Sequence, residues 1–207
     1  MTYKQLSIEK FTKALASGDP TPGGGGASAL AGAVGAALGS MVCNLTLGKK
    51  KYADVQDDIE KIIQGCEELQ KRMVDLIDED AEAFEPLARA YGMPKDDPAR
   101  EEVMQRSLLL ACAAPLEIMR AAGEAVELHA QLCRKGSSVV LSDVGAGAAL
   151  CKAALTAASL NVFVNSKSIK DAATAQKLEA EADELLRKYC PAADEILNDV
   201  TSRLRQS

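Results

Sequence analysis

The sequence predicts an all-α protein, an up-and-down bundle of about six long helices, two of them Ala/Gly-rich and buried. Alanine dominates the apolar residues, aromatic residues make up only 3% of the chain and Trp is absent, which favours closely packed helices over a β-sandwich. Apolar residues recur at spacings of three and four, and no run alternates convincingly as a strand. Because 47% hydrophobic residues suffice for one core and no linker interrupts the chain, residues 1–207 are expected to form a single domain.

The first predicted helix covers residues 7–17, with Ser7 as its N-cap. Gly18 ends this helix, and Pro20 prevents it from continuing. The loop that follows contains four consecutive glycines: Gly23, Gly24, Gly25 and Gly26. It is predicted to lead into the N-terminus of a buried helix, where free backbone N–H groups would face a ligand.

The second predicted helix covers residues 27–47 and contains no charged residue. Gly48 is expected to cap it, and three lysines follow at the negative end of the helix dipole. The run is long enough to span a membrane, but it is rich in Ala and Gly rather than in Leu, Ile and Phe. We therefore expect a core helix that packs closely through small residues, and no membrane.

The third predicted helix covers residues 55–91, with a possible kink at Pro86, and it ends at Gly92 and Pro94. Apolar residues at helical spacing predict its buried stripe: Ile59, Ile62, Ile63, Cys66, Leu69, Met73, Leu76, Ile77, Phe84 and Leu87.

The fourth predicted helix begins at Asp97 and Pro98, runs to about Lys135, and is expected to kink or break at Pro115. Its inward face is predicted to consist of Leu108, Leu109, Cys112, Leu116, Met119, Val126 and Cys133.

The fifth predicted helix covers residues 144–164, is again rich in Ala and Gly, and is expected to be capped by Ser142 or Asp143. The sixth covers residues 171–205, with a break expected at Pro191.

Composition excludes several classes of function. The formal net charge of −6 argues against a nucleic-acid-binding protein, which would normally carry a basic face. A single histidine, His129, nearly excludes a histidine-based metal site, so no metal is expected. The six cysteines form no C-x-x-C motif, and the N-terminus lacks the apolar core of a signal peptide, which together favour a cytoplasmic protein with reduced, mostly buried thiols.

Asp80 is the most informative polar residue, because it interrupts the apolar stripe of the third helix. Ile77, Asp80 and Phe84 follow one another at spacings of three and four, whereas Asp78 and Glu79 lie off the stripe. A carboxyl group on a buried face loses hydration, so its pKa should rise unless a cation pairs with it. Such a group is a candidate general acid/base, and a structural role in bonding a neighbouring helix or a lysine is equally compatible with the pattern.

The four glycines do not form a known phosphate-binding loop. A P-loop requires Gly-Lys-Ser/Thr after the glycines, and Ala27-Ser28-Ala29 stands there instead. A dinucleotide-binding fingerprint requires a preceding strand, where this chain has a helix and Pro20. Two interpretations stay open: a backbone nest for a carboxylate, a carbonyl or a ring, and a tight turn that lets the next helix enter the core.

Five further polar residues are candidates for contacts with a ligand. Asn161 and Asn165 share one helix face and could read the amide edge of a heterocycle, or cap the helix end. Lys50, in its lysine triplet, could neutralise an acidic ligand tail, although such a run is more often a solvated helix end. Asn44 is the lone larger amide of its uncharged run, and Asp143 is more simply an N-cap.

Seven segments stand in the order found in the cyclodeaminase/cyclohydrolase family, which this chain resembles over nearly its whole length. They are Pro-Thr-Pro-Gly-Gly-Gly-Gly-Ala-Ser-Ala (20–29), Gly-Ala-Ala-Leu-Gly-Ser-Met-Val (35–42), Asp-Glu-Asp-Ala-Glu-Ala-Phe (78–84), Met-Pro-Lys (93–95), Pro-Leu-Glu (115–117), Leu-Ser-Asp-Val-Gly-Ala-Gly-Ala (141–148) and Leu-Asn-Val-Phe-Val-Asn (160–165). The family includes the cyclodeaminase domain of formiminotransferase-cyclodeaminase and stand-alone methenyltetrahydrofolate cyclohydrolases.

The resemblance implies an all-α fold, a homodimer that pairs through helices, and a folate site between or beside the subunits. It also implies that Asp80 is the acid/base, the residue that the helical stripe singles out independently. No formiminotransferase half is present in this chain, so that activity is expected to be absent.

The function expected from this resemblance is hydrolysis of 5,10-methenyltetrahydrofolate to 10-formyltetrahydrofolate, which we place first because the chain stands alone. The alternative is cyclodeamination of formiminotetrahydrofolate, with release of ammonia. A second alternative is a helical folate-binding protein without catalysis. Both reactions move protons around one carbon, so one buried Asp is sufficient and no cofactor beyond the folate substrate is expected.

Overall fold

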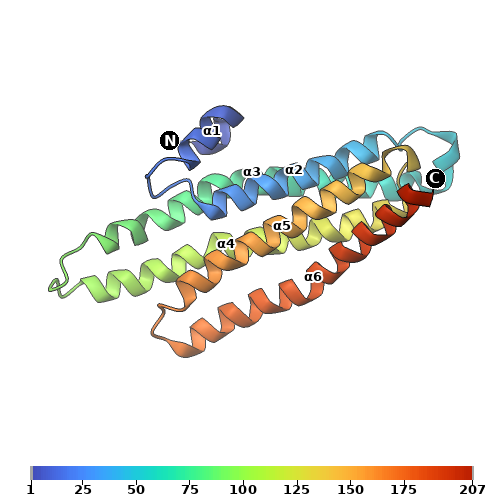
Figure 1. Ribbon diagram of the computed structural model, residues 1–207. Helices are drawn as coiled ribbons and strands as arrows, with labels where there is room; N and C mark the ends of the chain where they lie inside the picture. The colour runs from blue at the N-terminus through green and yellow to red at the C-terminus, as the bar shows by residue number, and fades with distance from the viewer. Residues whose placement is uncertain (1, 207) are drawn as a thin grey trace.

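The computed structural model describes residues 2–206 and contains six α-helices and no strand within that range, as predicted (Figure 1). The helices are α1 (Ile8–Leu15), α2 (Gly24–Asn44), α3 (Gln56–Tyr91), α4 (Arg100–Lys135), α5 (Leu141–Ser166) and α6 (Ala172–Gln206). Three short 3-10 turns accompany them: η1 (Tyr3–Gln5), η2 (Lys50–Val55) and η3 (Ser138–Val140).

Helices α2 to α6 run in alternate directions and form one elongated bundle, with the short α1 to one side of it (Figure 1). Helix α2 packs against α3 and α5, and α5 also packs against α4 and α6. The two Ala/Gly-rich helices therefore lie next to each other, and the predicted all-α up-and-down bundle is confirmed.

Small residues allow α2 and α5 to approach closely. A Cβ atom added to Gly35 would lie 2.5 Å from the Sγ of Cys151, so only a glycine fits there. The backbone carbonyl of Gly35 is 3.0 Å from the Nε2 of His129, which is itself fully buried. Both helices are long and apolar enough to cross a membrane by length and composition, but 61% of the apolar window of α2 and 44% of that around α5 are buried within the bundle.

The starts of both Ala/Gly-rich helices differ from the prediction. Helix α2 begins at Gly24, inside the glycine run, because tertiary packing outweighs the cost of about 1 kcal/mol that each glycine imposes on a helix. Helix α5 begins at Leu141, so Ser142 and Asp143 lie inside its first turn and neither is the N-cap. The reason is that η3 leads directly into α5, and its last residue, Val140, occupies the cap position without a side-chain hydrogen bond.

The break expected at Pro191 is wrong, and of the kink or break expected at Pro115 the break does not occur. Helix α4 continues through Pro115 and α6 continues through Pro191. A proline removes one helical hydrogen bond and costs about 3 kcal/mol, and packing along a helix of 36 or 35 residues offsets that cost.

Two side chains lie elsewhere than predicted. Leu109 is 43% exposed on α4 instead of facing inward. Asp78 is buried although it lies off the apolar stripe, because the N-terminal segment covers it: the backbone N–H groups of Tyr3 and Lys4 donate to its Oδ1 at 2.6 and 3.3 Å.

Candidate active site

The first turn of α2 lies directly against Asp80 of α3. A Cβ atom added to Gly25 would lie 2.1 Å from the Oδ1 of Asp80, so any side chain at position 25 would occupy the space of the carboxyl group. The glycine run and the carboxyl that interrupts the stripe of α3 are therefore one structural unit. Gly25 is needed for this close approach, whereas a Cβ atom added to Gly23, Gly24 or Gly26 would lie 3.4 Å or more from its neighbours.

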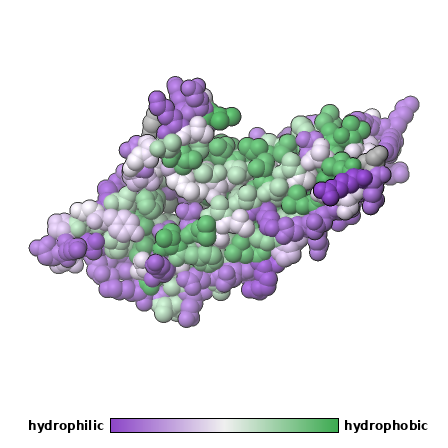
Figure 2. All heavy atoms as spheres, viewed as in Figure 1, coloured by the Kyte–Doolittle hydropathy of each residue, from purple (hydrophilic) through white to green (hydrophobic). Residues whose placement is uncertain are grey.

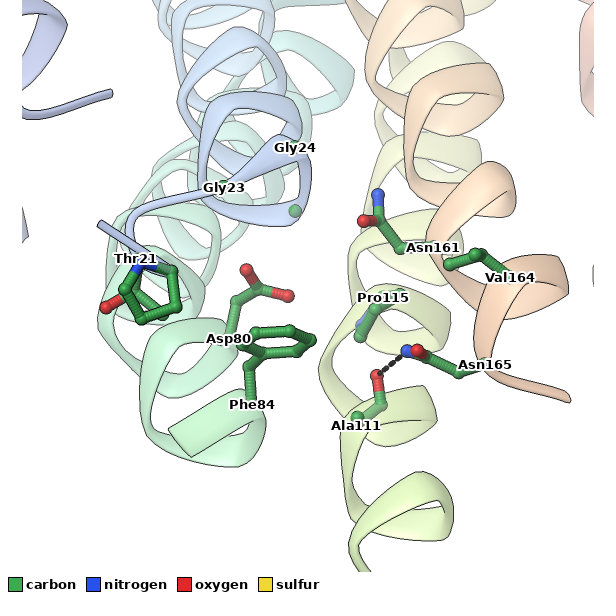
Figure 3. A pocket seen from close by; sticks show the side chains of 12 residues that line it. Thr21, Gly23, Gly24, Asp80, Phe84, Ala111, Pro115, Asn161, Val164 and Asn165 are labelled. Atoms are coloured by element: carbon green, nitrogen blue, oxygen red, sulfur yellow. Dashed lines mark hydrogen bonds between the residues drawn. The ribbon is translucent and has the colours of Figure 1, made fainter. Parts of the chain in front are cut away.

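A cavity of about 200 Å³ opens beside this contact (Figure 3). Asp80 and Phe84 line one side, and the opposite side comes from α4 and α5 (Figure 3). The remaining wall is formed by the loop that enters α2 and by Gly23, Gly24 and Gly25. Ligand pockets usually measure roughly 300–1,000 Å³, so this cavity suits a ring system rather than an entire large ligand.

Burial raises the pKa of the Asp80 carboxyl to about 6, and a hydrogen bond from the backbone N–H of Gly26 limits the rise. Among residues 2–206, no Lys, Arg or His lines the cavity, so no described side-chain cation there holds the carboxyl ionised. A group with this pKa exchanges a proton readily near neutral pH, as a general acid/base requires.

Asn161 and Asn165 extend from α5 into the wall opposite Asp80 (Figure 3). The Nδ2 of Asn161 donates to the carbonyl of Ala157 at 3.2 Å, and its amide lies beside Gly24. The Nδ2 of Asn165 donates to the carbonyl of Ala111 on α4 at 3.1 Å. One N–H of each amide is therefore engaged with the backbone.

The N-terminal segment holds the loop that enters α2. The hydroxyl of Tyr3 lies 3.1 Å from the carbonyl oxygen of Thr21 and 3.0 Å from its Oγ1. Tyr3 is in turn attached to α3 through the bond from its backbone N–H to Asp78. Helix α3 thus carries both Asp80 and the anchor of the loop that faces it.

Three of the candidate ligand-binding residues lie at the other end of the bundle. Asn44 is the last residue of α2, Lys50 begins η2, and Asp143 lies in the first turn of α5, the end of that helix remote from Asn161 and Asn165. Helix α2 has 21 residues and is therefore about 30 Å long, so within one subunit these side chains do not reach the cavity. Gly26 lies behind the cavity wall and contributes its N–H to Asp80.

The sequence singled out neither Thr21, Pro115 nor Val164 as a site residue, yet all three line the cavity. Phe84 was recognised only as part of the apolar stripe, although its position four residues after Asp80 places it on the same face. Within residues 2–206, no group of three or more His, Cys, Asp or Glu side chains is arranged to hold a metal ion.

A family model described as formiminotransferase-cyclodeaminase matches residues 7–184. The methenyltetrahydrofolate cyclohydrolase of Methylorubrum extorquens is 40% identical to this chain over 202 residues, which cover 96% of this chain and 97% of that protein. The formimidoyltransferase-cyclodeaminase of Dictyostelium discoideum is 29% identical over 198 residues, which cover 96% of this chain and 37% of that protein.

A solved structure has nearly the same fold. The crystal structure of formiminotetrahydrofolate cyclodeaminase from Thermotoga maritima superposes with a TM-score of 0.89 at 29% identity, covering 97% of this chain and 98% of the other. Similarity over this length at these identities is consistent with the resemblance that the seven sequence segments indicate.

Proposed function

This chain belongs to the formiminotransferase-cyclodeaminase family, and we propose that it is an enzyme that hydrolyses 5,10-methenyltetrahydrofolate to 10-formyltetrahydrofolate. The observation that carries the proposal is Asp80, a carboxyl with a pKa of about 6 that faces a cavity with no cationic side chain in its lining. The 40% identity to a methenyltetrahydrofolate cyclohydrolase, across nearly the full length of both chains, supports this reaction over its alternatives.

Asp80 performs the proton transfers in this proposal. The ionised carboxylate accepts a proton as water forms a C–O bond to the methenyl carbon of the cationic substrate. The C–N5 bond then breaks, its electron pair goes to N5, and the carboxyl returns the proton there. The hydroxyl proton leaves to solvent as the formyl C=O forms, so one proton is released per turnover. A cavity that carries one carboxyl and no side-chain cation is suited to the positive charge of this substrate.

Cyclodeamination of formiminotetrahydrofolate is the second candidate, since relatives at 29% identity carry that name and the same carboxyl could protonate departing ammonia. The two reactions are distinguished by the methenyl absorbance of purified protein mixed with each folate. Faster decay of methenyltetrahydrofolate than in buffer, lost in Asp80→Asn, supports the cyclohydrolase. Appearance of that absorbance with ammonia release supports the cyclodeaminase. Folate binding without either reaction would leave only a non-catalytic folate-binding protein.

We also propose that the enzyme is a homodimer that pairs through the exposed sides of α2 and α5. Figure 2 shows hydrophobic atoms gathered along these two helices. Exposed apolar side chains on them and their connections are Val34, Met41, Leu45, Val139, Leu160 and Val164. Helix α2 has no charged residue, and Lys152 of α5 is turned toward Asp194 of α6, at 2.6 Å.

The size and charge of this face favour a second copy of the chain as its partner. Two helices about 30 and about 40 Å long and about 10 Å apart present ~700 Å², close to the ~800 Å² per partner of a stable interface. Antiparallel pairing keeps the two lysine triplets apart and brings Lys50 of the partner subunit to the end of the bundle that holds the cavity, where it would meet the acidic tail of a folate outside the cavity. The partner would then cover the part of a folate that a 200 Å³ cavity leaves outside.

Sedimentation and activity of Val34→Lys test the dimer. A buried lysine in the interface should produce a monomer with reduced turnover, whereas Val103→Lys, at a valine of α4 that is 38% exposed against 45% for Val34, should remain dimeric. A dimeric and active Val34→Lys variant would show that α2 is not in the interface.

We further propose that the reaction takes place in the cytoplasm, where free thiols such as those of this chain stay reduced. It proceeds without a cofactor in this proposal, because hydrolysis of the methenyl group neither oxidises nor reduces its substrate.

A further inference from the structure

We propose that Asn165 is a substrate-specificity residue whose Oδ1 accepts an N–H hydrogen bond from the pterin ring, and that Pro115 acts as the positioning residue that orients it. This inference rests on the proposed folate substrate. It starts from one interaction between two helices, the bond from the Nδ2 of Asn165 to the carbonyl of Ala111 (Figure 3).

Pro115 makes that carbonyl available. In a continuous helix the carbonyl of Ala111 would accept from the backbone N–H of residue 115, but proline has no N–H. The carbonyl is buried beside α5, and an unpaired buried carbonyl is costly. The Asn165 side chain, only 6% exposed, takes the vacant position at 3.1 Å.

This bond determines which way the Asn165 amide faces. A carbonyl oxygen can only accept, so the group that meets Ala111 must be the NH₂ and not the oxygen. The Oδ1 is then directed away from α4. Asn165 lines the cavity, and no donor among the described residues bonds to its Oδ1. Within residues 2–206 this oxygen is not one of the fully buried polar atoms that lack a partner, so it keeps some accessible surface. Pro115 of α4 thus fixes the orientation of the Asn165 acceptor on α5.

The second amide of the wall is arranged in the same way. One N–H of the Asn161 amide is engaged with the Ala157 carbonyl, and its Oδ1, to which no described residue donates, is available as an acceptor. With the carboxyl of Asp80 opposite, the cavity has three side-chain groups that can accept, and the Thr21 hydroxyl, which also lines it, interacts with Tyr3. A pterin ring carries complementary N–H donors at its 2-amino group, N3 and N8. A pre-oriented acceptor discriminates against an analogue that lacks its donor, because its own desolvation then goes uncompensated.

Pro115→Ala and Asn165→Leu, alone and combined, separate this role from helix packing. Asn165→Leu alone should lower stability, because the Ala111 carbonyl loses its partner. In the double variant the N–H of residue 115 satisfies that carbonyl, so stability should return. The KM for 5,10-methenyltetrahydrofolate should nevertheless stay raised, roughly tenfold or more, with little change in kcat, as expected when a ring contact made in ground state and transition state is lost.

Two controls complete the experiment. Pro191→Ala removes a proline from the interior of α6 that does not line the cavity, and should leave KM unchanged. The 8-deaza, N3-methyl and 2-desamino-2-methyl analogues of the substrate each lack one of the three ring donors. The wild type should discriminate against one of them, and the double variant should not.

Each result has one meaning. Recovery of both stability and KM in the double variant would show that Asn165 only joins two helices, and would overturn the inference. Failure to recover stability would show that the bond from Asn165 to the Ala111 carbonyl does not stabilise the protein, and would also overturn the inference. A wild type that neither turns over nor binds a reduced folate would instead refute the proposed function itself, and this inference with it.

Discussion

Replacing Asp80 by asparagine should make the protein more stable at neutral pH while abolishing turnover. The pKa of this carboxyl is about 6 in the folded protein against 3.8 for an unperturbed aspartate, because burial disfavours its charged form. A difference of about 2 units corresponds to about 3 kcal/mol, and partial exposure reduces the expected gain to about 1–3 kcal/mol. The amide oxygen of the introduced asparagine can still accept from the Gly26 N–H, so that contact is retained.

The gain should depend on pH in a defined direction. Between pH 4 and 6 the folded protein binds the Asp80 proton more tightly than the unfolded chain, so wild-type stability falls as pH rises through about 4 to 6 and stays lowered above it. The variant lacks this titration. Urea unfolding at about pH 4.5, 6 and 8 should therefore show a difference in unfolding free energy that is small at the lowest pH and reaches its full value at the highest.

Asp75→Asn is the matched control on the same helix. Hydrogen bonds from Lys4 and Lys71 lower the pKa of Asp75 to about 2, so its charged form is favoured in the folded state and its loss should not stabilise the protein at pH 8. If Asp80→Asn destabilises the protein at pH 8, or shifts stability equally at all three pH values, burial is not the cause of the raised pKa and the reasoning is refuted.

Three further predictions concern the same bundle. The kcat/KM for methenyltetrahydrofolate hydrolysis should rise with pH through about 6 as Asp80 ionises and becomes a base, and a profile flat from pH 5 to 8 would contradict that role. Gly25→Ala should lose most activity and about 1–3 kcal/mol of stability, because its Cβ would lie 2.1 Å from the carboxyl oxygen, whereas Gly18→Ala, with no atom within 4 Å, should behave as wild type in assay and melt. Burial lowers the pKa of His129, so the unfolded chain takes up a proton at higher pH than the folded protein. The free energy of unfolding should therefore fall as pH drops below about 6.5. His129→Gln can still bond the Gly35 carbonyl, and its unfolding in urea should lack this fall.

Much of the fold follows from local chemistry that is visible in the sequence. Ser7 caps α1, its Oγ accepting from the N–H of Lys10 at 3.3 Å, and Gly92 follows the last residue of α3, both as predicted. These signals act within one turn, so no knowledge of the rest of the molecule is needed to read them. The positions where α2 and α5 begin, Gly24 and Leu141, were not predicted, because they depend on packing between the two helices and not on helix propensity.

The candidate site was only partly visible in the sequence. The spacing of Asp80 in its apolar stripe pointed to a buried carboxyl, and the glycine run pointed to a close approach, but nothing in the chain shows that Gly25 is what approaches Asp80. Asn44 and Lys50 had the right chemistry for a ligand, yet the antiparallel course of the helices carries them to the opposite end. Pro115 looked like a break and instead frees a carbonyl for another helix.

The amino-acid sequence alone indicates the helices, the two Ala/Gly-rich segments that must pack against other helices, and one carboxyl on an apolar helix face. Each of these depends on periodicity or on neighbours within one turn. Which groups meet is set only by tertiary packing. Asp80, the glycines and the α5 amides come from distant parts of the chain, and the contacts among α2, α3, α4 and α5 set the distances on which pKa and hydrogen bonding depend.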